Sequence, residues 1–306
     1  MQFDLQGHRG ARGLAPENTF PAFSCALSIG VTTLELDTSI TSDGVVVVAH
    51  DRRLNPDITR DQYGQWLREP TPAVCSLTFQ ALQTFDVGRI NPASSYFQRF
   101  PDQLGSDGVR MPSLESVFAM CRHTNVRFNI ETKLSPLAPD EAPSPAQFVE
   151  ALKRVVEDAG MTDRVTVQSF DWRTLQILQD LGSSLPLSYL TSNDSITPAH
   201  SSPWTGNFQL ENYGTVPQLV AAASDQVQER IWSPDFHMIS EADVQEALSL
   251  GLKVVPWTLN DAAQMRLALE WQVTGFITDF PDRARMIMRE NGLELPAQWH
   301  PPNPTS

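Results

Sequence analysis

The chain has no long apolar run, because no stretch approaches the roughly eighteen uninterrupted apolar residues of a membrane-spanning helix. Residues 1–6 also lack the basic segment and apolar segment that begin a secretory signal. We therefore expect no stable membrane insertion. The protein is expected to be cytoplasmic if the sequence is complete, and periplasmic or secreted if a signal peptide has been removed.

Cysteine is scarce. The 306 residues contain three cysteines, Cys25, Cys75 and Cys121, which are far apart and odd in number. This spacing is typical of neither a disulfide framework nor a cysteine zinc site.

Basic residues are outnumbered as well: 22 Lys and Arg against 36 Asp and Glu give a formal net charge of −14. Proteins that bind nucleic acid or anionic lipid carry basic surfaces, so neither partner is expected. A small anionic substrate is still compatible, provided that a metal ion or a few cations make its site locally positive. Nothing in the sequence indicates an oligomeric state.

Short β-rich runs alternate with helical patterns along nearly the whole chain. Besides a hairpin partner at 44–50, eight runs are recognisable, at 3–7, 32–38, 126–133, 164–170, 185–191, 230–233, 252–259 and 274–279. Eight βα units in about 300 residues are typical of a TIM (β/α)8 barrel. The competing doubly wound sheet usually has a G-x-G-x-x-G first turn, which is lacking here. We predict one barrel domain over 1–306, ending in a proline-rich tail at 296–306.

Residues 52–110 interrupt this repeat. A structureless loop of that length is uncommon in a compact domain, so we predict an inserted cap subdomain after the second barrel strand. A helical stretch is expected near 77–85 within it. Before the cap, Asn18 is the expected N-cap of a helix over 19–29.

Charged side chains gather where predicted strands end. Glu35 and Asp37 end the second run, Glu131 and Lys133 end the third, and residues two apart in a strand share a face. Barrel enzymes place their active sites at these strand ends. Three converging carboxylates suit a hard cation such as Mg²⁺ or Ca²⁺. For any single acid, a solvated strand end or an ion pair is the alternative.

Two histidines, His8 and His50, also end β runs. Histidine titrates near neutral pH, which suits general acid–base catalysis on a phosphate ester. Arg9 follows His8 and offers a forked donor for phosphate oxygens. Three more residues at strand ends are candidates for a substrate pocket: Gln168, Phe170 and Trp257.

Seven fragments at successive strand ends resemble the glycerophosphodiester phosphodiesterase family. They are HRGARGLAPENT at 8–19, ELD at 35–37, AHD at 49–51, ETK at 131–133, QSF at 168–170, PWTLN at 256–260 and GFITDFP at 275–281. The resemblance covers the whole barrel and implies a TIM barrel with a cap after its second strand. By resemblance, the metal ligands are Glu35, Asp37 and Glu131, the acid–base pair is His8 and His50, and the phosphate is bound by Arg9 and Lys133.

The resemblance also implies a reaction. The family hydrolyses glycerophosphodiesters, such as glycerophosphocholine or glycerophosphoethanolamine, to sn-glycerol 3-phosphate and an alcohol, with one divalent cation. Two alternatives stay open. One is a related lysophospholipase D or sphingomyelinase D-like phosphodiesterase, which would need an apolar lip to reach lipid. The other is a barrel that binds phosphodiesters without cleaving them.

Overall fold

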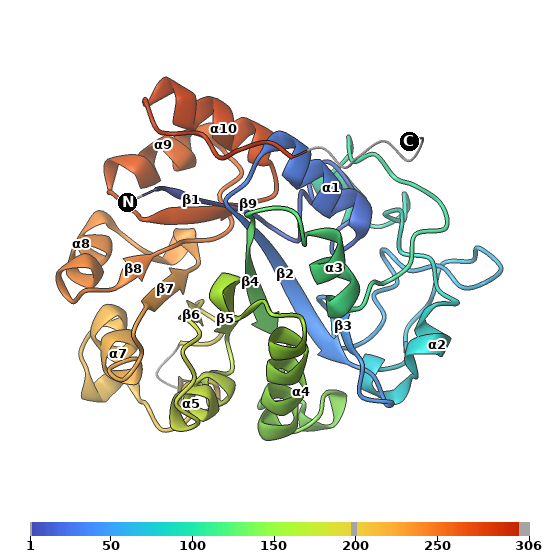
Figure 1. The fold of residues 1–306 in the computed structure, drawn as a ribbon, viewed down its shortest axis with the longest axis horizontal. Coiled ribbons are helices and arrows are strands. Elements are labelled where there is room, and N and C mark those ends of the chain that lie inside the picture. Colours follow the sequence, from blue (N-terminus) through green and yellow to red (C-terminus); the bar gives the residue numbers. More distant parts are fainter. Residues whose placement is uncertain (1, 197–200, 300–306) are drawn as a thin grey trace.

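The computed structural model describes residues 2–196 and 201–299. Eight parallel strands form its sheet in the order β8-β7-β6-β5-β4-β2-β1-β9 (Figure 1). They are β1 Asp4–Gly7, β2 Thr33–Ile40, β4 Arg127–Thr132, β5 Val165–Ser169, β6 Leu187–Thr191, β7 Arg230–Pro234, β8 Lys253–Val254 and β9 Gly275–Thr278. A ninth strand, β3 Val46–Val48, pairs antiparallel with β2. The amide of Thr274 donates to Val254 O at 2.9 Å, so β8 and β9 nearly close the ring.

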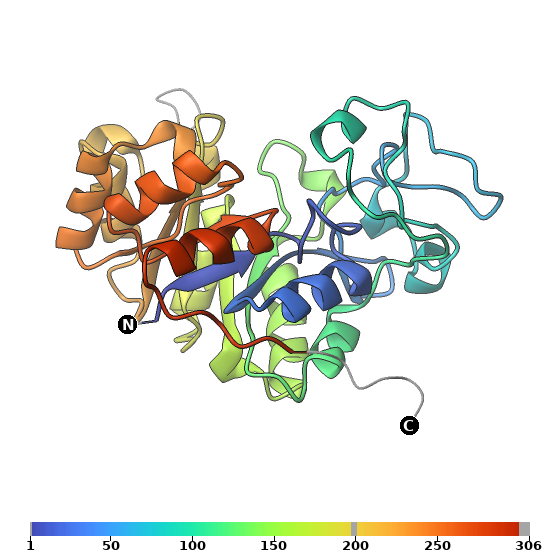
Figure 2. The same cartoon turned by 90° about the horizontal axis from the view of Figure 1, so that it is seen from above.

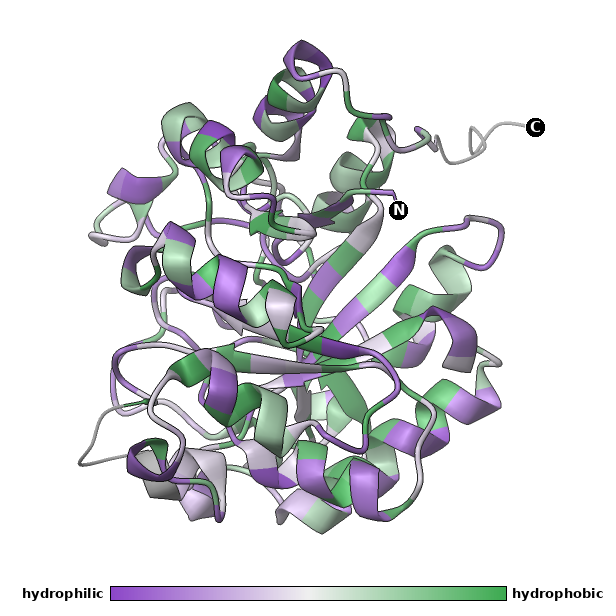
Figure 3. Cartoon of the chain, turned by 90° about the vertical axis from the view of Figure 1, so that its left-hand side faces the viewer, coloured by the Kyte–Doolittle hydropathy of each residue, from purple (hydrophilic) through white to green (hydrophobic). Residues whose placement is uncertain are grey.

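Helices surround this ring, as the sequence predicts for a TIM barrel. They are α1 Phe20–Ile29, α3 Leu114–Met120, α4 Pro145–Asp158, α5 Trp172–Asp180, α6 Ser201–Thr205, α7 Val216–Ala223, α8 Glu241–Ser249, α9 Ala262–Glu270 and α10 Pro281–Glu290, with the short α2 Phe79–Leu82 in the inserted segment. In Figure 3 the outer helices carry hydrophilic and hydrophobic stretches in alternation. Such helices bury one face against the strands and leave the other in water.

Helix α4 illustrates how the sequence sets these elements. Ser144 and Gln147 form a capping box at its start, and Pro145 occupies the first turn. Its apolar residues then recur with helical spacing and are buried at Phe148, Val149, Leu152 and Val156. The helix therefore covers the outer face of the sheet with one continuous apolar stripe.

Some boundaries differ from those expected. The predicted strand over 252–259 is regular only at Lys253–Val254, because Pro256 has no amide hydrogen to donate to a neighbouring strand. The N-cap of α1 is Thr19 rather than Asn18. Asn18 has a φ of 56° and turns its side chain toward Asp37, to which its Nδ2 donates at 2.9 Å.

Residues 52–110 follow β3 and lie to one side of the barrel (Figure 2). The helix expected near 77–85 is a single turn, α2, and most of the segment is irregular. An apolar cluster separate from the main core joins the segment to β3. It contains Leu54, Val74, Leu82 and Val87 of the segment together with Val47 of β3 and Met111. We refer to residues 52–110 as the cap.

The barrel interior is polar on one side and apolar on the other. Gln6, Asn129 and Gln168 point inward, where Asn129 Nδ2 donates to both glutamine carbonyls at 2.8 and 2.9 Å. Ile231, Val255 and Ile277 form a small apolar cluster that Trp257 covers. The barrel interior therefore contains two different sets of side chains: the hydrogen-bonded amides of Gln6, Asn129 and Gln168, and the apolar cluster that Trp257 covers.

Three further features can be compared with the sequence. All three cysteines are free thiols. Within residues 2–196 and 201–299, no helix is both long and apolar enough to cross a membrane. Of the proline-rich tail, residues 300–306 lie outside the described part of the chain.

Candidate active site

Three carboxylates meet at the C-terminal ends of β2 and β4. Glu35 and Asp37 both point inward from β2, and Glu131 lies beside Asp37 because these two residues are partners in the parallel ladder. All three are buried, and each offers an oxygen within 4.8 Å of the other two. We call these residues the acid cluster. The structure thus brings together the three acids that the sequence singled out.

Burial makes the charge of the acid cluster costly. Burial and the Asp37 carboxylate raise the pKa of Glu35 well above its usual value. The same two influences raise the pKa of Glu131 to about 7, against the attraction of Lys133. Burial also acts to raise the pKa of Asp37, but His50, Arg9 and Lys133 outweigh it and hold that pKa well below the usual range. Without a further cation, the cluster therefore retains protons near neutral pH.

The hydrogen bonds of the cluster fit a bound cation. Glu35 is oriented by two donors, the Arg9 amide at 2.8 Å and Gln168 Nε2 at 2.7 Å. Asp37 Oδ1 is buried and has no hydrogen-bond partner among the described residues. A buried carboxylate oxygen without a donor is destabilising, and Lys133 Nζ, 3.8 Å from this one, is too far away to donate a hydrogen bond to it. With Glu35 and Glu131 beside this oxygen, the three carboxylates offer a set of oxygen ligands suited to a hard divalent ion.

His8 follows β1 and is held from behind. Its Nδ1 lies 2.7 Å from Asp279 Oδ1, and its Nε2 faces the acid cluster at 3.9 Å from Glu35 Oε2. Burial and the nearby Arg12 lower the pKa of His8 to about 4, although Asp279 acts in the opposite direction. His8 is therefore neutral at pH 7, with a hydrogen on Nδ1 for Asp279 and a lone pair on Nε2.

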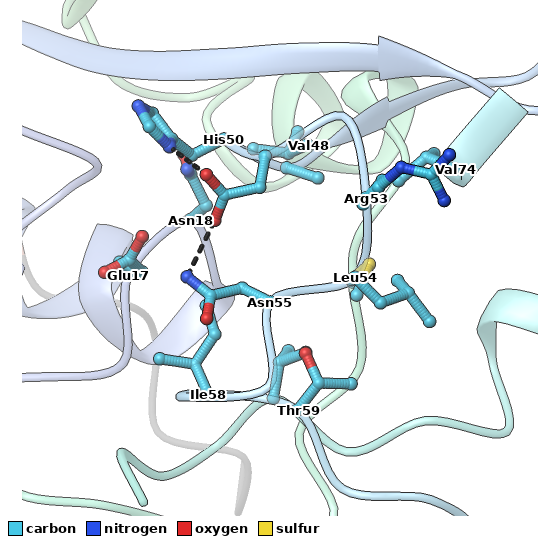
Figure 4. Close-up of a pocket in the computed structure, with 14 residues that line it drawn as sticks. Glu17, Asn18, Val48, His50, Arg53, Leu54, Asn55, Ile58, Thr59 and Val74 are labelled. Carbon is cyan, nitrogen blue, oxygen red and sulfur yellow. Dashed lines mark hydrogen bonds and ion pairs between the residues drawn. The ribbon is translucent and has the colours of Figure 1, made fainter. Parts of the chain in front are cut away.

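His50 follows β3 and has a similar arrangement. Its Nδ1 lies 2.9 Å from Asp51 Oδ1, while Asn55 Nδ2 donates to Asp51 Oδ2 at 2.8 Å (Figure 4). Burial, Arg9 and Lys133 lower the pKa of His50. The residues around it line a small cavity of about 30 Å³ between the barrel and the cap. Both histidines are thus held at Nδ1 by a carboxylate.

Arg9 and Lys133 supply the positive charge near the acid cluster. Arg9 Nη1 donates to Glu17 at 2.5 Å, and Arg9 Nε lies 3.3 Å from Asp37 without a hydrogen-bond partner among the described residues. Lys133 Nζ donates to Glu131 at 2.7 Å and lies 3.8 Å from Asp37. Both cations are buried, so each pairs with an acid and keeps the mouth of the barrel from being uniformly negative.

The three expected pocket residues are placed differently from one another. Phe170 and Trp257 pack edge to face at 5.5 Å, both partly exposed, and Lys133 Nζ lies 5.9 Å from the Phe170 ring centre. Gln168 is buried below the acid cluster, where its amide joins Glu35 to Asn129. Gln168 thus supports Glu35 from inside the barrel, and its contact with substrate stays a prediction. Its Nε2 donates to Glu35 and its Oε1 accepts from Asn129, so both polar atoms of the side chain form hydrogen bonds inside the barrel.

The chain is similar to known proteins over nearly its whole length. The sequence pattern of the glycerophosphoryl diester phosphodiesterase family matches residues 8–283. The chain belongs to this family. A family protein of known structure, from Silicibacter pomeroyi, is 32% identical, with a TM-score of 0.82 over 96% of this chain and 95% of that one. These findings confirm the family, the enzyme class and the barrel fold that the sequence indicated.

Other family members resemble the chain over similar lengths. The glycerophosphodiester phosphodiesterase of Bacillus subtilis is 26% identical over 283 residues, which cover 90% of this chain and 83% of that protein. A phosphodiesterase of Oleispira antarctica, solved in complex with the product sn-glycerol 3-phosphate, is 17% identical with a TM-score of 0.67. Its alignment covers 94% of this chain and 96% of that one, which shows a shared fold.

The site of the present chain also contains contacts that the sequence did not single out. Arg12 donates to both oxygens of Asp279, from Nε at 2.7 Å and from Nη2 at 3.0 Å, and Tyr96 of the cap donates to Glu17. Asp279, Arg12 and Glu17 lie inside two of the family fragments. No spacing in the sequence shows that they pair, and Tyr96 lies in none of the fragments.

Proposed function

We propose that this chain hydrolyses glycerophosphodiesters to sn-glycerol 3-phosphate and an alcohol, with one divalent cation. The observation that carries the proposal is the buried acid cluster, which lies between two carboxylate-held histidines in a member of this family. Glycerophosphocholine and glycerophosphoethanolamine are the proposed substrates, and Mg²⁺ or Ca²⁺ is the proposed ion. All candidate residues that the family resemblance requires are present.

The acid cluster would hold the ion through Glu35, Asp37 and Glu131. Bound there, a divalent cation supplies positive charge to the phosphate and acidifies a hydroxyl or water beside it. The geometry supports this role, because the buried Asp37 Oδ1 and the raised pKa values of Glu35 and Glu131 both call for a cation.

The chain's own residues would bind the phosphate and move the protons. Arg9 and Lys133 border the acid cluster and would hold the non-bridging phosphate oxygens. Each histidine, held at Nδ1 by a carboxylate, would transfer protons through Nε2. One would accept the proton of the nucleophile, either water or the substrate's neighbouring hydroxyl, and the other would protonate the departing alcohol oxygen. Attack by the substrate's hydroxyl gives a cyclic phosphate, which water must then open to yield sn-glycerol 3-phosphate.

The experiment measures release of sn-glycerol 3-phosphate from glycerophosphocholine by the purified chain with Mg²⁺ or Ca²⁺. We expect turnover that a chelator abolishes. His8→Ala and His50→Ala should each lower kcat by about 10²–10⁴-fold, the usual contribution of a general acid or base. His123→Ala is the matched control, because His123 is exposed and precedes the N-terminal end of β4, whereas Glu131 lies near the C-terminal end of that strand.

Two outcomes would contradict the proposal. Turnover of lysophosphatidylcholine without turnover of glycerophosphocholine would favour the lipid-cleaving alternative. Binding of glycerophosphocholine by metal-loaded protein without any hydrolysis would favour the non-catalytic barrel.

A further inference from the structure

One hydroxyl of the cap lies between two sets of contacts that lead to the active site. Tyr96 is partly buried, and its Oη donates to a carboxylate oxygen of Glu17. Tyr96 Oη also accepts a longer hydrogen bond from Arg12 Nη1 at 3.4 Å. Burial and the Glu17 carboxylate raise the pKa of Tyr96 above its usual value, so the phenol keeps its proton across the working pH range.

Each of the two partners of Tyr96 holds a different active-site side chain. Glu17 uses its other oxygen to accept from Arg9 Nη1 at 2.5 Å. Arg12 binds both oxygens of Asp279, and Asp279 in turn holds His8 Nδ1 at 2.7 Å. The Tyr96 hydroxyl is therefore two contacts from Arg9 and three from His8.

The segment that carries Tyr96 is fixed to the barrel. Phe100 is 3% exposed, packs edge to face on Tyr96 at 5.5 Å, and lies 5.0 Å from the Arg12 guanidinium. Gln103 Nε2 donates to Arg12 O at 2.7 Å, and the Leu104 amide donates to Leu14 O at 2.9 Å. The loop that holds His8 and Arg9 is thus bound to the cap by backbone contacts as well as by the hydroxyl.

We propose that Tyr96 is a positioning residue, through which the cap fixes the orientation of Arg9 by way of Glu17 and that of His8 by way of Arg12 and Asp279. The inference rests on the proposed function of Arg9 and His8. Its physical basis is that a buried carboxylate with two fixed donors holds its arginine in one orientation. Without the hydroxyl, Glu17 and Arg12 each lose a partner and can rotate, and the groups that they hold lose alignment.

Replacing Tyr96 by phenylalanine tests the hydroxyl separately from the ring. Tyr96→Phe keeps the packing against Phe100 and removes both hydrogen bonds of Oη. Displacement of reacting groups by about 1 Å can lower rates by about 10²-fold, so a partial loss of alignment should lower kcat by about tenfold. KM for glycerophosphocholine should change by less than about threefold, because the phosphate-binding groups remain present.

A double-mutant cycle separates positioning from a general loss of stability. Glu17→Gln should also lower kcat, and adding Tyr96→Phe to it should lower kcat by less than Tyr96→Phe does alone, because both changes break the path to Arg9 and only the path through Arg12 is left for the second change to break. Tyr63→Phe is the matched control, since Tyr63 lies in the cap with 78% of its surface exposed, and it should leave kcat unchanged. Circular dichroism and thermal unfolding would check that each variant is folded.

The outcomes separate this inference from the function on which it rests. If the wild-type chain hydrolyses no glycerophosphodiester, the proposed function is wrong and the inference with it. If the wild type is active but Tyr96→Phe keeps kcat within twofold, or its loss adds fully to that of Glu17→Gln, only the role of Tyr96 is overturned. Should Tyr96→Phe not fold, a Glu17→Gln variant with wild-type kcat would overturn it instead.

Discussion

Replacing Asp279 by asparagine is expected to reduce both the activity and the stability of this enzyme. Asp279 is completely buried after β9, and its carboxylate accepts four hydrogen bonds. They come from His8 Nδ1, from Arg12 Nε and Nη2, and from Asn260 Nδ2, at 2.6 to 3.0 Å. The nitrogens of Asn260 and Arg12 can only donate hydrogen bonds. The side chain at position 279 must therefore have an acceptor at both of its terminal atoms, as a carboxylate does.

The magnitude follows from what an amide can accept. Asparagine offers one carbonyl oxygen, so two of the four donors would face its NH₂ group, and Arg12 would lose its buried counter-charge. Breaking a buried ion pair costs about 3–5 kcal/mol of the free energy of unfolding. For a chain of this length, such a loss should lower the midpoint of thermal unfolding by about 10 °C. The protein should remain folded at 25 °C, because a typical domain has about 5–15 kcal/mol of stability.

The effect on catalysis should exceed the effect on binding. An asparagine NH₂ that donates to His8 Nδ1 would move the histidine hydrogen to Nε2, the atom that faces the acid cluster. A comparable exchange behind a catalytic histidine lowers kcat by about 10⁴-fold in serine proteases. We expect a loss of about 10²-fold or more in kcat here, with KM within about threefold, because Asp279 is expected to contact no phosphate oxygen.

Steady-state kinetics with glycerophosphocholine and thermal unfolding together test this prediction. Asp171→Asn is the matched control: Asp171 is also completely buried and pairs with Arg173, at 2.8 and 2.5 Å, away from His8. Its kcat should stay within about threefold of wild type. If Asp279→Asn lowers the unfolding midpoint but leaves kcat within threefold, the reasoning that Asp279 sets the His8 tautomer is refuted.

Three further predictions concern the acid cluster. A divalent ion at about 100 times its Kd should stabilise the folded chain by about 2.7 kcal/mol, seen as a higher unfolding midpoint that a chelator reverses; an unchanged midpoint would contradict a metal site. The pKa of Glu131 is raised to about 7 and that of Glu35 is raised as well, so ion binding must displace protons, and the ion affinity should rise between about pH 6 and about pH 8. Calorimetry in two buffers of different ionisation enthalpy measures the released protons. An ion affinity that does not change with pH would contradict proton release from Glu131 and Glu35. Gln168→Leu removes one of the two donors to Glu35 and should weaken ion binding by about 10–100-fold, whereas Ser188→Ala, whose hydroxyl has no partner among the described residues, should not.

Much of the barrel was predictable because its signals are local. A buried strand such as β2 alternates apolar residues that face the helices, Leu34 and Leu36, with acids that face inward, Glu35 and Asp37. That alternation can be read from eight successive residues. Since the C-terminal ends of parallel strands meet at one mouth, strand-end residues could be assigned to a common site before their contacts were known.

Local pattern was a weaker guide to irregular segments. The helix expected near 77–85 is one turn, because most of that stretch packs its apolar residues on the small core of the cap instead of continuing a helix. Asn18 was expected to cap α1, and it faces Asp37 instead, 19 residues away in the sequence. In both cases a tertiary contact outweighs the local preference.

The sequence by itself determined the order of strands and helices, the residue types at the mouth of the barrel and the family, since each is fixed by short-range periodicity or by contiguous motifs. Only the tertiary structure decided which of those residues pair. His8 and Asp279 are 271 residues apart, and Tyr96 and Glu17 are 79 apart. Such partners meet only when β9 lies beside β1 and the cap packs on the loop after β1. The physical reason is that hydrogen-bond partners are selected by closure of the barrel, which no local spacing encodes.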